Sequence, residues 1–143
     1  MLKMENCTIY CKMQIDEIEA VCTRLSILNP QKVEVSEGKV ECTVESGVVR
    51  ISRMVFEQRA DRFSKLCADT MNYFRSKRDS NESGVVCVLA HLEDTNAILG
   101  VVADPSFDGI AMLPELIGFL AFEFQGMIFN GAEMLDRNGE VIA

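Results

Sequence analysis

The spacing of apolar residues predicts an alternation of strands and helices along this chain. Residues 6–12 alternate loosely and are rich in strand-forming residues, so they predict a first strand. Apolar residues then recur every three or four positions over residues 15–28, which is typical of a helix with one buried face. Asn29 and Pro30 end this helix, because the residue before a proline disfavours helical backbone.

Three predicted strands follow, joined by short turns that contain glycine. Residues 39–45 give the clearest signal, since every second residue is apolar, as in a strand with one buried face. Residues 32–36 and 48–55 flank this strand, and Arg53 falls on the same side of its strand as Val49. Two hairpins in series predict an antiparallel meander.

The second half of the chain predicts two long helices separated by strands. Residues 56–77 carry one apolar stripe, and the polar residues 78–84 predict an exposed loop. The continuous apolar runs 85–92 and 97–103 predict a pair of strands, the first of them central and covered on both faces. Residues 110–124 then predict a helix that is apolar almost all round.

A short hairpin completes the pattern, with residues 127–129 and 133–135 on either side of Asn130 and Gly131. Most connections between strands are therefore hairpins, which favour an antiparallel sheet. We predict a single α+β domain over residues 1–143, with about three helices packed mainly on one face of the sheet. No apolar run reaches the ~18 residues of a membrane helix.

The net charge of −8 is unevenly distributed along the chain. Residues 1–83 hold equal numbers of acids and bases, whereas residues 84–143 hold nine acids and one base, Arg137. An acidic surface repels phosphate backbones and anionic lipids, so the sequence argues against nucleic-acid and membrane binding. The opposing signal is a basic cluster, interleaved with acids, at Arg50, Arg53, Arg59, Arg62 and Lys65.

Six cysteines and one histidine are the residues most able to carry chemistry. The chain opens without an apolar run behind its first lysine, so we expect a cytoplasmic protein with free, mostly buried thiols. Cys7 and Cys11 have the spacing of half a zinc site, but no second pair accompanies them. We therefore predict no metal site.

His91 falls in the apolar run 85–92, with no Gly-x-Ser-x-Gly elbow elsewhere in the sequence to supply a nucleophile. On a strand, Cys87 would lie about 13 Å from His91, too far for contact. No glycine-rich phosphate loop occurs. We therefore predict no catalytic residue, no cofactor and a protein that is not an enzyme.

Acidic residues in the predicted turns have structural explanations beside chemical ones. Asp104, Asp108 and Glu115 flank the loop before the last helix. Paired carboxylates can perform acid–base chemistry, but Asp108 could equally cap that helix. Asp136 and Asn138 resemble the start of a calcium loop, but its remaining acidic ligands do not follow, so we predict a turn.

The apolar helix over residues 110–124 is the strongest indication of a binding surface. A helix without a polar face is either buried deeply or covered by another chain. We expect a homo-oligomer, with a dimer as its form, or a complex with another protein; burial beneath the C-terminal hairpins is the alternative. The predicted apolar contacts are Leu116, Phe119, Leu120 and Phe122, and the predicted acidic rim is Glu93, Asp94, Asp104 and Asp108.

Residues 126–140 resemble a segment of uncharacterised bacterial α+β proteins. In those proteins an apolar helix precedes a short strand of glycine, aliphatic residues and phenylalanine, and then an Asp-x-x-Gly turn. The resemblance extends over residues 105–140 and implies no assigned chemistry. The size, acidity and element order also resemble type III secretion chaperones, which are acidic dimers that bind a partner chain. The opening strand and the terminal hairpins depart from that second pattern.

These features predict a cytoplasmic, non-enzymatic, protein-binding domain in a chaperone-like or immunity-type role. The alternative is a small-molecule-binding protein or an enzyme with a pocket between the sheet and the helices. A nucleic-acid-associated regulator that uses residues 50–65 is a third hypothesis. The enzyme hypothesis requires a deep pocket that contains His91 or a cysteine of low pKa.

Overall fold

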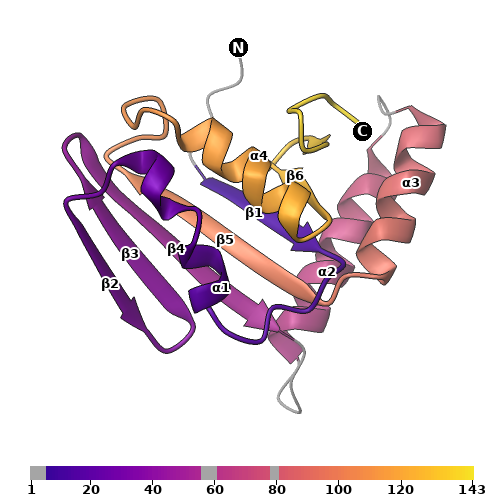
Figure 1. Cartoon of the computed structure of the whole chain (residues 1–143). Coiled ribbons are helices and arrows are strands. Elements are labelled where there is room, and N and C mark those ends of the chain that lie inside the picture. The colour runs from indigo at the N-terminus through magenta and orange to yellow at the C-terminus, as the bar shows by residue number, and fades with distance from the viewer. Residues whose placement is uncertain (1–5, 56–60, 78–80) are drawn as a thin grey trace.

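The computed structural model describes residues 6–55, 61–77 and 81–143, which form seven strands and a set of helices (Figure 1). The strands are β1 (Asn6–Cys11), β2 (Lys32–Ser36), β3 (Lys39–Val44), β4 (Gly47–Val55), β5 (Ala97–Asp104), β6 (Gly126–Phe129) and β7 (Met134–Leu135). The helices are α1 (Glu19–Cys22), the 3-10 turn η1 (Leu25–Leu28), α2 (Asp61–Ser76), α3 (Glu82–Glu93) and α4 (Leu113–Glu123). Within these ranges no helix has the length and apolarity needed to cross a bilayer.

The strands join into one antiparallel sheet in the order β2-β3-β4-β5-β1-β6-β7. The meander predicted from the alternating residues is β2-β3-β4, and the predicted terminal hairpin is β6-β7, so both are confirmed. The first strand of the chain lies between β5 and β6 and is therefore central. The α+β class with an antiparallel sheet is confirmed as well.

The helix predicted over residues 15–28 is shorter and is divided into α1 and η1. It ends at Asn29, which adopts a left-handed backbone with φ 53°. The helix predicted over residues 56–77 is α2, and its first five positions lie outside the described residues. Residues 78–80 of the predicted loop also lie outside them, while the end of that loop belongs to α3.

Residues 85–92 are helical, so their prediction as a strand was wrong. The side chain of Asn81 caps this helix, since its oxygen accepts a hydrogen bond of 3.1 Å from the Ser83 amide. An apolar run of this length does not distinguish a buried strand from a helix. Val86 is apolar although it is exposed, so the exposed side of the helix carries no polar residue at that position. The buried positions nevertheless follow helical spacing: Gly84, Val88, His91 and Leu92.

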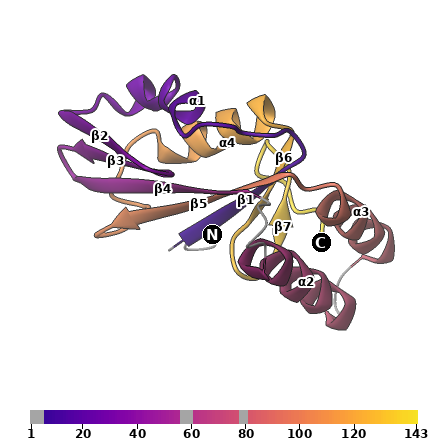
Figure 2. The ribbon, with the colours of Figure 1, turned by 90° about the horizontal axis from the view of Figure 1, so that it is seen from below.

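Helices α1, η1 and α4 cover one face of the sheet, here called the first face (Figures 1 and 2). Alternate residues of β1, β3, β4 and β5 pack beneath them, including the fully buried Ile9, Val49 and Leu99. Arg53 continues the same alternation on β4, and its Nη1 donates a hydrogen bond of 2.8 Å to the Ile15 carbonyl. This cluster is the larger of the two apolar cores.

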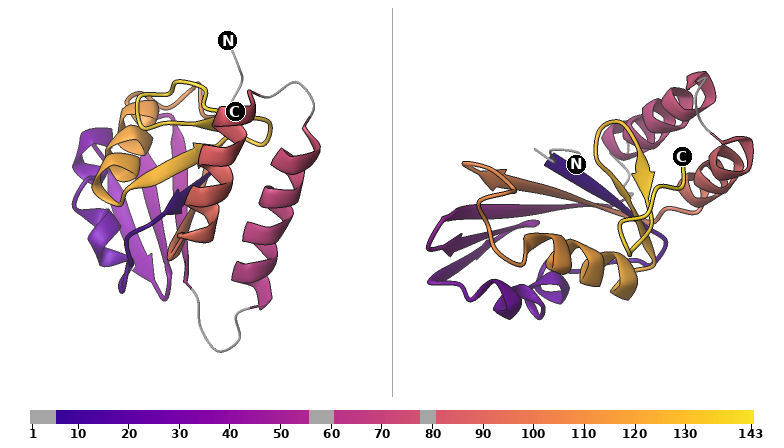
Figure 3. Two further views of the ribbon diagram at one scale, coloured as in Figure 1. Left: turned by 90° about the vertical axis from the view of Figure 1, so that its right-hand side faces the viewer. Right: turned by 90° about the horizontal axis from the view of Figure 1, so that it is seen from above.

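Helices α2 and α3 lie side by side on the opposite face, here called the second face (Figures 2 and 3). They pack against β1, the start of β5 and the terminal hairpin, and form a smaller core with Tyr10, Ile98 and Met134. The expectation of helices mainly on one face therefore holds for α1, η1 and α4 but not for this pair. The rest of the second face carries exposed residues such as Arg50 and Ser52.

Tyr10 in β1 connects both helices of this pair to the sheet, and its side chain is fully buried. Its hydroxyl forms a hydrogen bond of 2.7 Å with the Thr70 hydroxyl on α2. Its carbonyl oxygen lies 2.6 Å from His91 Nε2 on α3, so the neutral imidazole donates there. Both partner residues are themselves buried, so each polar group depends on the other for its hydrogen bond.

Gly84 lets the first turn of α3 approach the C-terminal residues closely. A Cβ atom at this position would lie 1.9 Å from the backbone oxygen of Ile142, which real Cβ atoms do not approach so closely. Residues after β7 also hydrogen-bond back to it, as the Ile142 amide donates to the Met134 carbonyl at 2.8 Å. Glycine at residue 84 therefore leaves the space that the C-terminal residues 142 and 143 occupy against α3.

Replacement of Gly84 by alanine should lower the free energy of unfolding by about 1–3 kcal/mol, because backbone atoms must move to admit the methyl group. Urea unfolding measures the change. Val86→Ala, at an exposed position of the same helix, is the control and should alter stability by less than about 0.5 kcal/mol. An exposed helical glycine would gain about 1 kcal/mol from alanine, so a more stable Gly84→Ala variant would contradict this packing.

Candidate functional site

Helix α4 buries one face and leaves two phenylalanines on the other. Leu113, Leu116, Ile117, Leu120 and Ala121 are buried against the first face of the sheet. Phe119 and Phe122 point away from that core and remain 43% and 58% exposed. An exposed phenylalanine leaves a large apolar surface in water, and two of them one helical turn apart form a patch rather than isolated exposures.

An apolar groove of about 690 Å³ runs between this exposed side of α4 and the loop that follows β7. The loop packs closely on the helix, since a Cβ atom at Gly118 would lie 3.0 Å from the Arg137 carbonyl oxygen. The side-chain oxygen of Asp136 fixes the turn by accepting hydrogen bonds from the amides of Asn138 and Glu140. The groove is lined by Pro114, Glu115, Ile117, Gly118, Phe119, Phe122, Ile128, Leu135, Arg137, Asn138 and Gly139.

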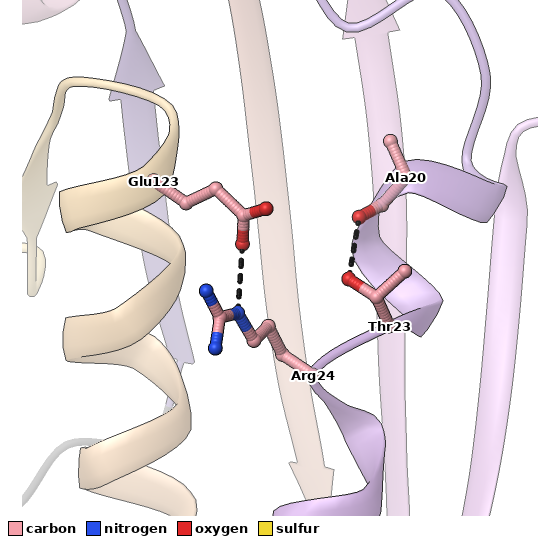
Figure 4. A network of polar contacts seen from close by, with 4 residues as sticks. All are labelled: Ala20, Thr23, Arg24 and Glu123. Atoms are coloured by element: carbon pink, nitrogen blue, oxygen red, sulfur yellow. Dashed lines mark hydrogen bonds and ion pairs between the residues drawn. The ribbon is translucent and has the colours of Figure 1, made fainter.

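Two arginines lie over the exposed rings. The Arg137 guanidinium is 4.5 Å from the centroid of Phe122, and that of Arg24 is 5.8 Å from the centroid of Phe119. Arg24 also reaches across to α4, where its Nε lies 3.0 Å from a carboxylate oxygen of Glu123 (Figure 4). These contacts fix the positions of the rings at the rim without covering them, because both phenylalanines stay exposed.

The four predicted apolar contact residues separate into two pairs. Leu116 and Leu120 are fully buried in the core of the first face, so neither is available to a partner. Phe119 and Phe122 are the members of the set that reach the surface. The sequence could not separate the pairs, since a helix apolar all round carries no polar side to mark its exposed face.

The four predicted rim carboxylates do not gather around the groove. Glu93 is the last residue of α3 and Asp94 follows it, just before β5, whereas Asp104 is the last residue of β5. An eight-residue strand spans roughly 26 Å, so the two groups lie at opposite ends of the sheet. Asp104 is also 4.0 Å from an Arg50 nitrogen, which pairs one residue of the acidic rim with one of the basic cluster.

Asp108 lies in the exposed loop before α4 and does not cap that helix, so this interpretation was wrong. The helix begins at Leu113, after Met112 has adopted a left-handed backbone with φ 68°, and no side chain caps it. Pro114 in the first turn suits a helix start, since its missing amide would have no helical partner there. Glu115 lines the groove instead, and Glu123 of the same helix pairs with Arg24, which lies over Phe119.

His91 serves as a structural hydrogen-bond donor and lies in the core at 5% exposure. Burial lowers its pKa below the ordinary value of 6.5, because the charged imidazolium would lose its hydration. The bond to the Tyr10 carbonyl raises this pKa, Lys12 lowers it further and Asp94 raises it, all to a smaller extent. Since residues 85–92 are helical, Cys87 lies one turn away rather than 13 Å, but it is exposed while His91 is buried.

All six cysteines are free, as predicted, and four of them are buried. Burial raises the pKa of Cys7 and Cys11 to about 12, and that of Cys67 to about 11. The thiolate is the reactive form of cysteine, so these three thiols are inert near neutral pH. Across the described residues, no three histidine, cysteine or acidic side chains are placed to hold a metal ion.

A cavity between the sheet and the helices, the feature that the small-molecule hypothesis requires, does exist. It measures about 690 Å³ and lies where the loop after β1 meets α2, the end of α3 and the end of β4. Asp16, Glu93 and Arg53 supply its charges, and Phe63 and Met71 are among its apolar residues. His91 does not line it, and the Cys67 thiol that does has a raised pKa, so this cavity holds neither group that the enzyme hypothesis required. His91 lines a separate hollow of about 450 Å³ beside Lys12 and Gln125, where its Nε2 is already bonded to the Tyr10 carbonyl.

Comparison of the chain with protein-family models, curated proteins and solved structures gives no match. Its function is therefore argued from its own surface. The groove beside α4 combines the exposed aromatic rings with charged side chains of both signs.

Replacement of His91 by glutamine should reduce the dependence of stability on pH. The folded chain protonates His91 less readily than the unfolded chain does, because its pKa is lowered. The stability from this group is therefore full above about pH 6.5 and is lost as the pH falls through the folded-state pKa. Urea unfolding between pH 8 and about pH 5 should show a shallower loss for His91→Gln, whose amide does not titrate. Equal slopes for the variant and the parent chain would contradict this.

Proposed function

We propose that this chain is a protein-binding domain that receives an apolar, basic segment of another protein in the groove beside α4. The observation that carries the proposal is the pair Phe119 and Phe122, exposed one turn apart over an apolar groove of about 690 Å³. Exposed aromatic rings at a groove are typical of the central residues of interfaces. A chaperone-like or immunity-type protein would use such a surface.

The energy available from these rings is substantial. Burial of a whole phenylalanine side chain gives roughly 1.5–3 kcal/mol, so two rings that are about half exposed would contribute about 1 kcal/mol each. Arg24 and Arg137 already lie over these rings and restrict their movement, so a partner would lose less side-chain entropy in ordering them. The groove is therefore organised before anything binds.

The charge of the chain favours a basic partner over a second copy. The net charge is −8; at the groove itself Arg24 and Arg137 balance Glu123 and Glu115, so the attraction for a basic partner comes from the excess of acids over the rest of the chain. Two copies of an acidic chain repel each other, whereas lysines or arginines on a partner would be attracted and would associate faster at low salt. A homodimer through α4 is the competing outcome, and it should strengthen as the salt concentration rises.

The proposed compartment is the cytoplasm, in keeping with the state of the cysteines. All six are free, and four of them are buried in the apolar cores. Oxidising compartments favour disulfides, whereas a reducing cytosol keeps thiols of this kind free.

Site-specific cross-linking tests the proposal directly. A photoreactive phenylalanine analogue placed at residue 119, in cells that make the protein, should capture a peptide of another protein that is rich in apolar and basic residues. The analogue at residue 122 should capture the same segment, and adding Phe119→Ser to that variant should lower the yield about fivefold, the effect of about 1 kcal/mol of binding energy. Mass spectrometry of the cross-linked peptide identifies the partner segment.

The same analogue at residue 86 is the matched control, since Val86 is an exposed apolar residue of α3 with 67% exposure. It should give no such product. Cross-links at residue 119 only to a second copy of this chain would show the homodimer instead. Equal products at residues 119 and 86 would contradict a specific site.

A further inference from the structure

A second cavity, of about 510 Å³, lies on the second face of the sheet beside α2. Helix α4 lies on the opposite face of the sheet from α2 (Figure 2), so this cavity is separate from the groove beside α4. The part of the second face that α2 and α3 leave uncovered forms its floor, and α2 supplies a wall with Arg62 and Leu66. Its volume falls within the range of small-molecule sites in proteins.

Strand register places four residues in one row across this floor. Lys39 of β3 pairs with Ser52 of β4, Ser52 pairs with Gly100 of β5, and Gly100 pairs with Thr8 of β1. All four line the cavity. Residues paired across antiparallel strands share one face. The row therefore presents Lys39 and the Ser52 hydroxyl on one side of Gly100, and the Thr8 hydroxyl on the other.

Gly100 leaves the centre of the floor open. A Cβ atom added there would meet no heavy atom within 4 Å, so neither packing nor a close backbone contact requires a glycine. Glycine weakens the interior of a strand, and it commonly marks a place where a ligand approaches the sheet. Here the missing side chain lowers the floor between Ser52 and Thr8.

The polar groups around this floor are not paired with the protein. Within the described residues the side chains of Thr8, Lys39, Ser52 and Arg62 form no hydrogen bond or ion pair. Among the described residues, the lining holds the bases Lys39 and Arg62 and the acid Glu37, while the side chain of Arg53 lies on the first face and bonds to the Ile15 carbonyl. A cavity of net positive charge in a chain of net charge −8 is suited to an anion.

Apolar side chains form the rest of the cavity. Met54 of β4 pairs with Ile98 of β5 in the next row on this face, and Leu66 and Phe63 line the wall. A ligand complementary to both parts would carry a negatively charged head and an apolar body. A bare inorganic anion would leave the apolar part in contact with water.

We propose that this cavity binds a small organic anion, with its carboxylate or phosphate head near Lys39 and Arg62 and its apolar body along Met54, Ile98 and Leu66. The open position at Gly100 admits the ligand to the sheet. This site is independent of the groove beside α4, so either proposal stands if the other fails.

The test is fluorescence titration with 8-anilinonaphthalene-1-sulfonate, an apolar anion, followed by displacement. Binding to the parent chain should be at micromolar concentrations and should weaken at least about tenfold in Lys39→Gln/Arg62→Gln. Octanoate or phenyl phosphate should displace the probe, and the stronger competitor of the two shows whether the site prefers a carboxylate or a phosphate. Octylamine and inorganic phosphate should not displace it.

Gly100→Val separates the site from the fold. Valine favours strands and meets open space at its Cβ, so the melting temperature should stay the same or rise while probe binding falls at least about tenfold. Val102→Leu, on the same face two residues along and outside the cavity, should bind the probe as the parent does. Lys65→Gln on α2 is the control for charge.

Three results would overturn the proposal. One is the absence of probe binding to the parent chain, and another is unchanged binding in both Gly100→Val and Lys39→Gln/Arg62→Gln. The third is loss of the probe only in Phe119→Ser/Phe122→Ser, which would place it in the groove beside α4.

Discussion

The hydrogen bonds of Tyr10 are the interaction on which the position of α2 and α3 against the sheet depends. Tyr10 lies in the central strand, and one residue holds α2 through its hydroxyl and α3 through its carbonyl oxygen. All three residues are buried, so the loss of one partner would leave a polar group without a hydrogen bond, at a cost of about 1–3 kcal/mol. The helix pair is also held by the smaller apolar core, to which the Tyr10 ring itself belongs.

Both candidate surfaces follow from how the helices divide between the faces. Because α2 and α3 are attached near β1 and the terminal hairpin, the second face beyond Gly100 stays uncovered and a cavity forms beside α2. On the first face, only one side of α4 packs against the sheet. Its other side meets a loop that reaches Gly118 but does not cover Phe119 and Phe122. The exposed rings are thus what remains after the core is complete.

Sequence patterns predicted the elements that depend on neighbouring residues, and failed where contacts between distant segments decide the structure. The alternation in residues 39–45 predicted β3, because one face of that strand is buried and the other is not. Residues 85–92 misled, since an apolar run has no period to read, and their helix is fixed by Asn81 and by the tail at Gly84. Residue spacing could not show that Phe119 is exposed while Leu120 is buried. Nor could it show that Lys39, Gly100 and Arg62 line one cavity, because contacts between distant segments decide both.

Hydrogen exchange in a Tyr10→Phe variant tests the central role of this residue most directly. The variant removes the hydroxyl and leaves Thr70 without its buried partner. The attachment of the helix pair predicts faster amide exchange in residues 61–76 and 82–93, with protection of β2, β3 and β4 unchanged. Exchange in the helix pair that equals that of the parent chain, or that rises equally throughout the sheet, would contradict it.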